Sequence, residues 1–384
     1  MTALPEPSKS TAKAIMQLWG SRNEPNRPHM GCSIIGHACD RYIWLTWRWA
    51  KSPDFEGRLL RLFDTGKREE ERLNQDLKDI GVELYTVDQD TGKQITVSAC
   101  GGHLAGSVDG IGKGFPEAPK SWAVVEQKTH SAKSFADLQK KGVRESKPQH
   151  FVQMQMYMGL LQLERALYLA KNKDNEEIYS EWVHFDQDTF TKHMIRADRL
   201  IVATEPPEKL SNDPAWYECK WCDFYELCHG QRAAEANCRT CCHASPVAKG
   251  AWHCDSINID LKEKDQRKGC DGHLYIPPLI PYAKPIDGST NSVTYQKTDG
   301  TTFTNGPGHW LSSELAVTVH TMVGDKVIDE IKEAFPGAKV VASEFGGFAD
   351  LEGDFDEELK KDAPDPKKEK ATAQNKAFIK GMRK

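Results

Sequence analysis

An apolar stretch ends on two charged side chains in the segment "SWAVVEQK", where Trp122–Val125 runs directly into Glu126 and Lys128. Residues two apart on a strand point to the same face of a sheet, so a carboxylate and an ammonium are expected side by side. The pattern E-x-K alone is weak evidence, because it starts at five positions: Glu126, Glu145, Glu218, Glu330 and Glu358. Only Glu126 ends an apolar strand. The other four are typical of charged helix faces or loops.

A second carboxylate, Asp109, lies upstream in the turn-rich segment "GSVDG". Gly and Pro in 112–119 predict a loop, so strands over 103–111 and 121–129 are expected to pair as a hairpin. Asp109 and Glu126 would then meet at one end of the sheet. Two carboxylates are ligands that Mg²⁺ or Mn²⁺ prefers, commonly with a substrate phosphate. Lys128 would orient or help deprotonate an attacking water, which predicts phosphodiester hydrolysis. A surface ion pair between Glu126 and Lys128 is the alternative interpretation.

Four motifs occur in the order Gly66-x-x-x-Glu70, Asp109, Glu126-x-Lys128 and Gln153-x-x-x-Tyr157. Over about residues 30–230 this order resembles the PD-(D/E)XK nuclease superfamily. The resemblance implies an α/β fold with a central mixed sheet flanked by helices. It also implies a set of functional positions: metal ligands at Asp109, Glu126, the backbone carbonyl of Gln127 and Glu70, water activation by Lys128, and support from Gln153.

Glutamate at position 70 makes the chain similar to λ exonuclease-type members of the RecB-like branch, although Glu69 and Glu71 are neighbouring alternatives. Gln153 and Tyr157 have a plainer interpretation as polar edges of a core helix. The resemblance implies a Mg²⁺- or Mn²⁺-dependent deoxyribonuclease, an exonuclease processing DNA ends in recombination, replication or DNA turnover. The alternatives are an inactive DNA clamp with the same fold and a flap or branch endonuclease. A phage origin and a single-strand-annealing or replication protein as partner would suit this function.

Basic residues follow the candidate site and predict a loop that contacts the phosphate backbone of DNA. A solvated basic loop is the alternative. The predicted DNA-binding residues are Lys133, Lys140, Lys141, Arg144 and Lys147.

Eight of the eleven cysteines fall between Cys219 and Cys270, and two C-x-x-C pairs among them favour metal sites over disulfides in a cytosolic chain. The first set resembles the iron–sulfur staple of AddB-type and CRISPR-associated RecB-like exonucleases. It implies a [4Fe–4S] cluster, with Zn²⁺ or free thiols as alternatives and Cys32 as a rival to the first ligand. Its ligands are Cys39, Cys219, Cys222 and Cys228. The second set predicts a structural Zn²⁺ on Cys238, Cys241, Cys254 and Cys270, with His273 or Cys242 as substitutes.

Composition limits the class of protein. At 384 residues, two or three domains are expected. The 28% share of charged residues and the lack of a run of about 18 apolar residues argue against a membrane span. The N-terminus has no apolar signal core, so a cytoplasmic protein is expected, in the host cytoplasm if phage-encoded. His103 and His150 lie near the motifs but are expected to be structural or surface residues.

The order of predicted elements is helix, several strands, helix, strand, which favours an α/β layer fold. Apolar periodicity predicts helices near 39–50, 58–80, 151–163 and 187–203 and strands near 82–87, 93–99, 165–172 and 177–186. Further short strands are expected near 291–296 and 301–306, and an amphipathic helix near 324–335. The predicted organisation is a polar leader at 1–29, the nuclease domain at 30–232, a zinc module at 233–282, a small α+β region at 283–351 and a disordered charged tail at 352–384.

Overall fold

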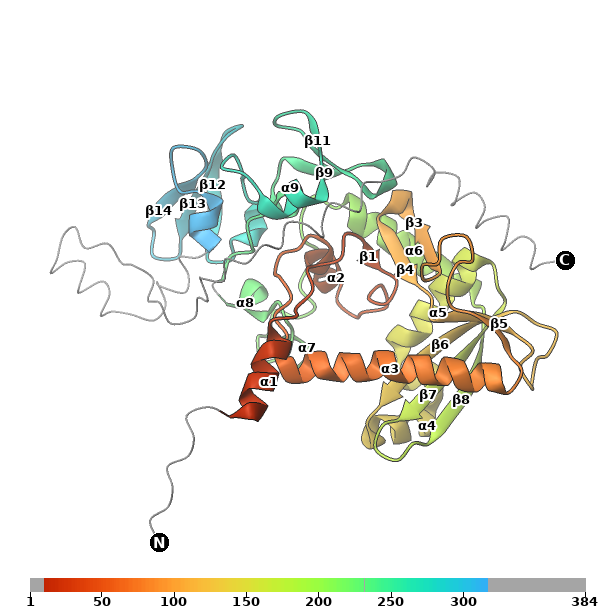
Figure 1. Ribbon diagram of the computed structural model, residues 1–384. Coiled ribbons are helices and arrows are strands. Elements are labelled where there is room, and N and C mark those ends of the chain that lie inside the picture. Colours follow the sequence, from red (N-terminus) through yellow and green to blue (C-terminus); the bar gives the residue numbers. More distant parts are fainter. Residues whose placement is uncertain (1–9, 231, 317–384) are drawn as a thin grey trace, which may run out of the picture. The chain divides into compact units, whose positions relative to one another are not determined.

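The computed structural model describes residues 10–230 and 232–316, which belong to one compact unit, Met1–Val317 (Figure 1). The amphipathic helix predicted near 324–335 and the charged tail predicted at 352–384 lie outside the described residues. Within the described residues, no helix is both long enough and apolar enough to cross a membrane.

A five-stranded mixed sheet carries the candidate site, as the α/β prediction requires. The order across the sheet is β2-β5-β6-β7-β8, and only the β6–β7 pair is parallel. The apolar part of β6 is fully buried from Ala123 to Val125, so this strand lies in the core. The strands are β2 (Glu83–Tyr85), β5 (Gly110–Lys113), β6 (Ala123–His130), β7 (Arg165–Asn172) and β8 (Ile178–His184).

The strand predicted at 103–111 is two strands in two different sheets, which corrects the hairpin prediction. β4 (Leu104–Ser107) lies between β1 (Met30–Gly31) and β3 (Thr96–Ala99) in a separate three-stranded sheet. Of these two strands, only β5 pairs with β6, from Gly110 opposite Val125 to Gly112 opposite Ala123. The chain changes sheets at Val108 and Asp109. Asp109 therefore lies outside both ladders, and its carboxylate is free to point at the end of β6.

Helices cover both faces of the five-stranded sheet. Helix α3 (Gly57–Asp79) packs Leu73 and Leu77 against Val125, Leu167 and other apolar side chains of one face. Side chains alternate along β6, so Glu126, Lys128 and His130 point to the opposite face. That face is covered by α4 (Ala132–Ser146) and α5 (Pro148–Leu161). Helix α6 (Gln187–Val202) packs behind α5. The predicted helices at 58–80, 151–163 and 187–203 are confirmed.

The basic segment that was predicted to be a loop is helix α4 (Ala132–Ser146), followed directly by α5 (Pro148–Leu161). Phe135, Leu138 and Val143 give α4 a buried stripe. Gly142, with φ of +75°, breaks the helical geometry near its end. This glycine and the proline that opens α5 are strong turn signals, and they masked the short apolar stripe.

The predicted polar leader contains helix α1 (Thr11–Gly20), which packs on the start of α3. A side chain at Gly57 would collide with the carbonyl oxygen of Met16, so the two helices approach closely there. The guanidinium groups of Arg22 and Arg61 both lie over the Trp19 ring. Residues 1–9 are outside the description. Helix α2 (Asp40–Trp47) lies within the predicted 39–50 helix, and the Cys39 thiol caps its first turn.

The cysteine-rich segment packs on α2 through a buried arginine, Arg239, which is 1% exposed. Its guanidinium stacks 3.6 Å from the Trp49 ring centroid and 4.8 Å from that of Trp252. Its Nη1 donates to the Trp47 carbonyl at 3.1 Å and its Nε to Gln266 at 2.9 Å. The elements of this segment are α7 (Tyr217–Lys220), α8 (Tyr225–Cys228), β9 (Ala244–Pro246), β10 (Trp252–Cys254), β11 (Ile259–Leu261) and α9 (Glu263–Lys268), with 3₁₀ turns at Cys238–Thr240, Ala248–Gly250 and Pro277–Leu279.

Replacing Arg239 with methionine is expected to lower the free energy of unfolding by about 3 kcal/mol, because it removes two charge-assisted hydrogen bonds and two desolvated cation–π contacts. Thermal unfolding should show a Tm lower by roughly 4 to 5 °C. Arg58→Met, at an exposed position of α3, is the control and should leave Tm nearly unchanged. Equal melting curves for the two variants would contradict this role.

A third antiparallel sheet of order β12-β13-β14 follows the cysteine-rich segment. The strands are β12 (Ala283–Gly288), β13 (Val293–Lys297) and β14 (Thr302–Asn305). The last two confirm the strands predicted near 291–296 and 301–306. Tyr295 is fully buried between β12 and β14 and stacks on Phe303.

Candidate active site

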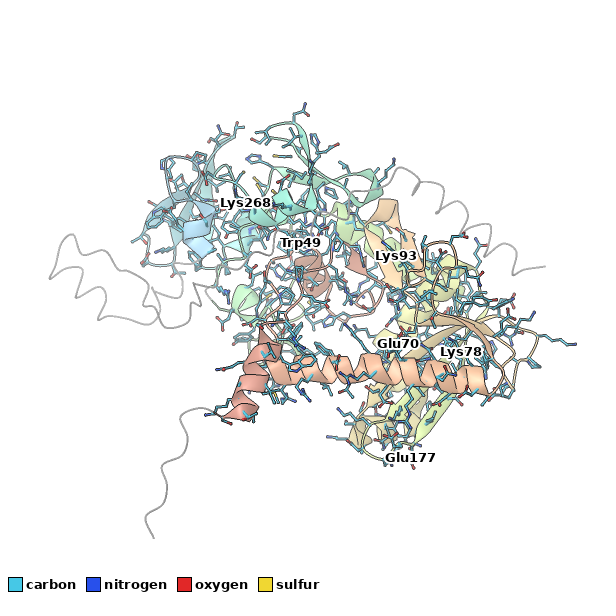
Figure 2. All side chains as sticks on the ribbon, in the orientation of Figure 1. Trp49, Glu70, Lys78, Lys93, Glu177 and Lys268 are labelled. Carbon is cyan, nitrogen blue, oxygen red and sulfur yellow. The ribbon has the colours of Figure 1, made fainter. Side chains whose placement is uncertain are left out.

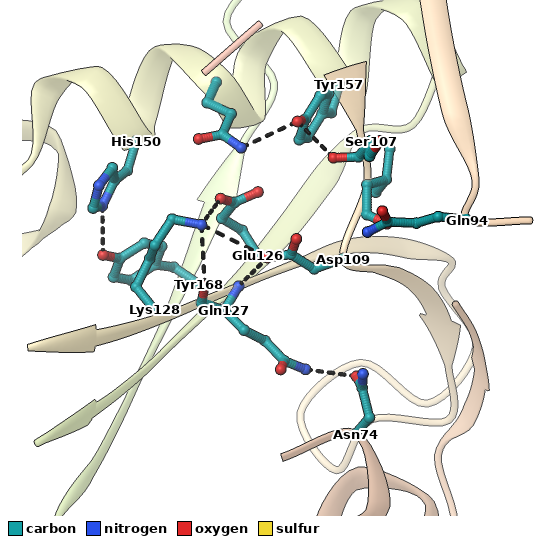
Figure 3. A network of polar contacts seen from close by, with 12 residues as sticks. Asn74, Gln94, Ser107, Asp109, Glu126, Gln127, Lys128, His150, Tyr157 and Tyr168 are labelled. Carbon is teal, nitrogen blue, oxygen red and sulfur yellow. Dashed lines mark hydrogen bonds and ion pairs between the residues drawn. The ribbon is translucent and has the colours of Figure 1, made fainter. Parts of the chain in front are cut away.

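The Lys128 ammonium binds three oxygen atoms at the end of β6 (Figure 3). It forms a hydrogen-bonded ion pair with Oε1 of Glu126, donates to the Gln127 carbonyl at 3.1 Å and lies 3.7 Å from Oδ2 of Asp109. Glu126 is fully buried, and its Oε2 has no hydrogen-bond partner among the described residues. These are the oxygens predicted to hold a metal, and they already surround a cation.

Asp109 is fixed by the backbone of the strand that carries Glu126. Its Oδ2 accepts a hydrogen bond from the Gln127 amide at 2.9 Å (Figure 3). The chain passes from one sheet to the other at Val108–Asp109, and this places the Asp109 carboxylate next to the Gln127 amide. Its side chain is 13% exposed, so one edge of the group still reaches solvent. The predicted meeting of Asp109 and Glu126 thus occurs in the structure, although by a different chain path.

Glu70 is the glutamate of α3 that faces the site, near the middle of the helix (Figure 2). Its neighbour Glu69 forms an ion pair with the Lys171 ammonium at 2.6 Å, and Glu71 is exposed. Burial and the Asp109 carboxylate raise the pKa of Glu70 to about 7, against the Lys128 ammonium. Of these three glutamates, Glu70 is the one that the structure places near Asp109 and Lys128.

Burial and neighbouring charges shift the pKa values of the site carboxylates and of the lysine, with different consequences for their protonation at neutral pH. Complete burial raises the pKa of Glu126 to about 8, although the Lys128 ammonium opposes the shift. Burial alone would lower the pKa of Lys128, but Glu126, Asp109 and Glu70 together raise it. Lys128 therefore keeps its proton at neutral pH and can donate hydrogen bonds. The groups that titrate near neutral pH are Glu126 and Glu70.

Gln153 contacts Tyr157, and among the described residues it forms no hydrogen bond with the site carboxylates. The Gln153 Nε2 donates to the Tyr157 hydroxyl at 3.1 Å, and that hydroxyl donates to the Ser107 carbonyl at 2.7 Å (Figure 3). Ser107 ends β4, two residues before Asp109. Gly106 makes this approach possible, because a Cβ there would lie 2.7 Å from the Tyr157 ring. The pair on α5 thus fixes the chain that presents Asp109.

Replacing Tyr157 with phenylalanine should reduce the proposed hydrolysis about tenfold, because the Ser107 carbonyl loses its donor and Asp109 is held less firmly. Steady-state rates on linear DNA would measure the effect. Tyr295→Phe is a matched control, since the buried Tyr295 hydroxyl has no partner among the described residues. A Tyr157→Phe enzyme as fast as Tyr295→Phe would contradict the positioning role.

Asn74 is a site residue that the sequence interpretation missed. Its Oδ1 accepts from the Gln127 Nε2 at 2.8 Å and ties α3 to β6 (Figure 3). The side chain of Gln127 thus points to α3, while its carbonyl faces Lys128. A signal was present, because Asn74 follows Glu70 by one helical turn and so shares its face.

The predicted DNA-binding side chains all lie on α4 or at the α4–α5 junction. Lys141 pairs with Asp137 at 2.7 Å and Arg144 lies 3.4 Å from Asp186. Lys147 is half-buried and donates to the Ser146 hydroxyl at 2.8 Å. Lys133 and Lys140 are exposed.

The first cysteine set lines a single cavity of about 220 Å³. Cys39 caps α2, Cys219 lies on α7, and Cys228 ends α8. Burial, followed by the charges of Cys228 and Cys39, raises the pKa of Cys222 to about 11. The rival ligand Cys32 is fully buried beside β4 and does not line the cavity.

The thiols of the second cysteine set also lie near one another. Burial and the neighbouring Cys241, Cys270 and Cys254 raise the pKa of Cys238 to about 12. His273 serves the turn beside them: burial lowers its pKa to about 4, and its Nε2 lies 3.0 Å from the Asn237 carbonyl, to which it donates. The other ring nitrogen, Nδ1, is buried and has no hydrogen-bond partner among the described residues, so this contact does not separate His273 from the four cysteines as a ligand.

As the side chains stand in the described residues, no three His, Cys, Asp or Glu groups surround a common point as metal ligands. At the carboxylate site the Lys128 ammonium occupies the shared space. The donor chemistry nevertheless fits a divalent cation, because the hard oxygen atoms include the unpartnered buried Oε2 of Glu126. The cysteine sets fit thiophilic metals, since thiolate sulfur is a soft ligand and a bound cation favours loss of the thiol proton.

Neither protein-family models nor curated proteins match the sequence. Among solved structures, SSO0001 is 15% identical with a TM-score of 0.34, covering 58% of this chain and 98% of its own. The alkaline exonuclease LHK-Exo from Laribacter hongkongensis is 14% identical with a TM-score of 0.32, covering 48% and 90%. The LHK-Exo complex with dAMP gives 11% and 0.31, covering 49% and 90%. Likeness of this size identifies neither a fold nor an activity. The function therefore has to be inferred from the side chains of this chain.

Proposed function

We propose that this protein is a Mg²⁺- or Mn²⁺-dependent nuclease that hydrolyses phosphodiester bonds in DNA, as an exonuclease acting on DNA ends. One observation carries the proposal: a buried Glu126, the Asp109 carboxylate and the Gln127 carbonyl converge on one cation, the Lys128 ammonium. A surface ion pair, the plainer interpretation, would not bury Glu126 completely.

Glu126, Asp109, the Gln127 carbonyl and Glu70 would hold the metal, which when bound would polarise a phosphate oxygen. Lys128 would turn from the carboxylates, keep its protons and donate hydrogen bonds to the scissile phosphate or to the attacking water, which it would orient. Gln153 and Tyr157 would keep Asp109 in place. The exposed side of α4, with Lys133 and Lys140, would contact neighbouring phosphates and make binding dependent on salt.

The test is hydrolysis of linear and closed circular DNA with Mg²⁺ or Mn²⁺ by protein purified without oxygen. Wild type should degrade the linear DNA and spare the closed circle, whereas Glu126→Ala should leave both DNAs intact. Glu145→Ala is the matched control, because Glu145 begins another E-x-K and is exposed on α4. Cleavage of the circle would favour an endonuclease. Binding of DNA without any cleavage by wild type would favour the inactive clamp.

We propose further that the cavity lined by Cys39, Cys219, Cys222 and Cys228 holds a [4Fe–4S] cluster. It would join the start of α2 to the segment of α7 and α8, and so connect the two ends of the nuclease region. Anaerobically purified protein should carry about four irons, with broad absorption near 400 nm. Cys222→Ser should lose both, and Cys100→Ser, outside the cavity, should keep them. A colourless protein that contains zinc instead of iron would contradict the cluster and favour Zn²⁺ at these four cysteines.

For the second set we propose one structural Zn²⁺ on Cys238, Cys241, Cys254 and Cys270. A metal there would join the turn at Cys238 to the end of β10, next to the Arg239 contact with α2. Metal analysis of Cys254→Ser should show one zinc fewer than wild type, with a lower Tm. Cys242→Ser is the control, because Cys242 is exposed at the edge of the set. Equal zinc content in Cys254→Ser and wild type would contradict the assignment.

A further inference from the structure

A chain of hydrogen bonds runs beside Lys128 on the same face of the sheet. The Ser134 hydroxyl lies 3.2 Å from Nδ1 of His130, and Nε2 of His130 lies 2.9 Å from the Tyr168 hydroxyl. The same hydroxyl lies 2.8 Å from Nδ1 of His150. The proposed hydrolysis assigns no role to this chain, and the sequence interpretation placed His150 among structural or surface residues.

The backbone explains why the chain ends next to the carboxylates. His130 follows Lys128 by two residues on β6, so the two side chains share a face. Tyr168 is the residue of β7 in register with Glu126. His150 lies in the first turn of α5, which covers this face. Figure 3 shows His150 and Tyr168 next to the Lys128 side chain.

Proton positions follow from counting donors. Burial lowers the pKa of His150 to about 3 and that of His130 to about 4, with Lys128 and Lys147 among the further causes. Both rings are therefore neutral, with one N–H each. If Ser134 donates to His130, then His130 donates to Tyr168 and Tyr168 donates to Nδ1 of His150. The remaining proton of His150 must then lie on Nε2. If every hydrogen bond in this series runs in the opposite direction, Nδ1 of His150 carries the proton and its Nε2 is an acceptor.

The outer end of the chain is open. Among the described residues, Nε2 of His150 has no hydrogen-bond partner, and it is not one of the fully buried atoms without a partner. It therefore reaches solvent, and the ammonium groups of Lys128 and Lys147 are near enough to the ring to lower its pKa. An anionic oxygen accepts hydrogen bonds but donates none. Such a ligand selects the direction in which Nε2 carries the proton.

We propose that Nε2–H of His150 binds a non-bridging oxygen of a nucleic-acid phosphate, and that Tyr168 and His130 fix the tautomer that makes this possible. The proposal rests on the nuclease function for its substrate. It adds a phosphate subsite formed by a neutral donor beside two ammonium groups. His150 would touch substrate, whereas Tyr168 and His130 would be positioning residues acting through it. Phosphate contacts of this kind set the register of the strand but read no sequence.

Kinetics on linear DNA test the subsite within the nuclease. His150→Ala should lower kcat/KM about thirtyfold, mainly through a higher KM, with Mn²⁺ affinity unchanged. Tyr168→Phe should lower it about fivefold, because the ring stays but the tautomer is no longer fixed. His184→Gln is the control, since His184 is exposed on β8. Equal kcat/KM in His150→Ala and His184→Gln would overturn the proposal.

A second measurement does not need activity or the alanine variant. Nitrogen-15 NMR of metal-free wild type should show His150 as the Nε2–H tautomer, and Tyr168→Phe should show a mixture. Adding inorganic phosphate should shift the Nε2 signal of His150 and leave that of His184 in place. No shift of His150 would overturn the subsite. If wild type fails to cut DNA but phosphate shifts His150, the nuclease proposal fails while the anion subsite stands.

Discussion

Replacing Lys128 with alanine is expected to slow DNA hydrolysis about a thousandfold while changing Mn²⁺ affinity less than tenfold. The physical reason is the division of charge at the end of β6. The carboxylates of Glu126, Asp109 and Glu70 raise the pKa of Lys128, so the lysine stays a hydrogen-bond donor and cannot be a metal ligand. Loss of the donor removes stabilisation of the charge that develops on the phosphate, and the oxygen ligands remain.

Two variants make this prediction specific. Glu126→Ala should lose both hydrolysis and Mn²⁺ binding, because it deletes a proposed ligand. Lys93→Ala removes an exposed ammonium from a turn and should change neither. Mn²⁺ binding by calorimetry and initial rates on linear DNA, measured on the same preparations, separate the roles. If Lys128→Ala lost metal binding as completely as Glu126→Ala, Lys128 would be an organiser of the carboxylates and not a donor to the reaction.

The pairing of Glu126 with Lys128 could be predicted from local rules because both residues lie on one regular strand. Strand alternation put Glu126 and Lys128 on one face, and the structure shows their ion pair. The sequence favoured Glu70 but left Glu69 and Glu71 as alternatives, since the choice depends on which face of α3 meets the sheet. Lys171 decided it by engaging Glu69 from β7. Such a partner is about a hundred residues away and invisible to a local pattern.

The errors in the fold have similar causes. The break at Asp109 joins two sheets, and one continuous extended stretch carries no sign of which neighbour each half will pair with. Helix α4 was missed because Gly142 and Pro148 outweighed a stripe of only three buried residues. The chain from Ser134 to His150 spans two strands and two helices. Histidine and tyrosine at such separations show no spacing that could announce their contact.

Metal affinity is expected to rise steeply with pH, and this second large effect follows from the raised pKa values. Glu126, with a pKa of about 8, and Glu70, with a pKa of about 7, hold protons at pH 6 that a divalent cation must displace. Each displaced proton gives about a tenfold gain in affinity per pH unit below its pKa. Mn²⁺ affinity should therefore rise up to about a hundredfold from pH 6 to 7, about tenfold from 7 to 8, and then level off.

Stability of the metal-free protein should move in the opposite direction. A carboxyl whose folded pKa lies above its unfolded value near 4.5 binds more protons in the folded state. The free energy of unfolding then falls as pH rises from about 5 to 8, and bound metal restores it. Calorimetric Mn²⁺ titrations and melting curves at pH 6, 7, 8 and 9 measure both trends. In Glu70→Gln, one proton fewer is displaced by the metal, so the logarithm of Mn²⁺ affinity should rise less steeply with pH. A Mn²⁺ affinity that does not change from pH 6 to 8 would contradict the assignment of these two carboxylates as ligands.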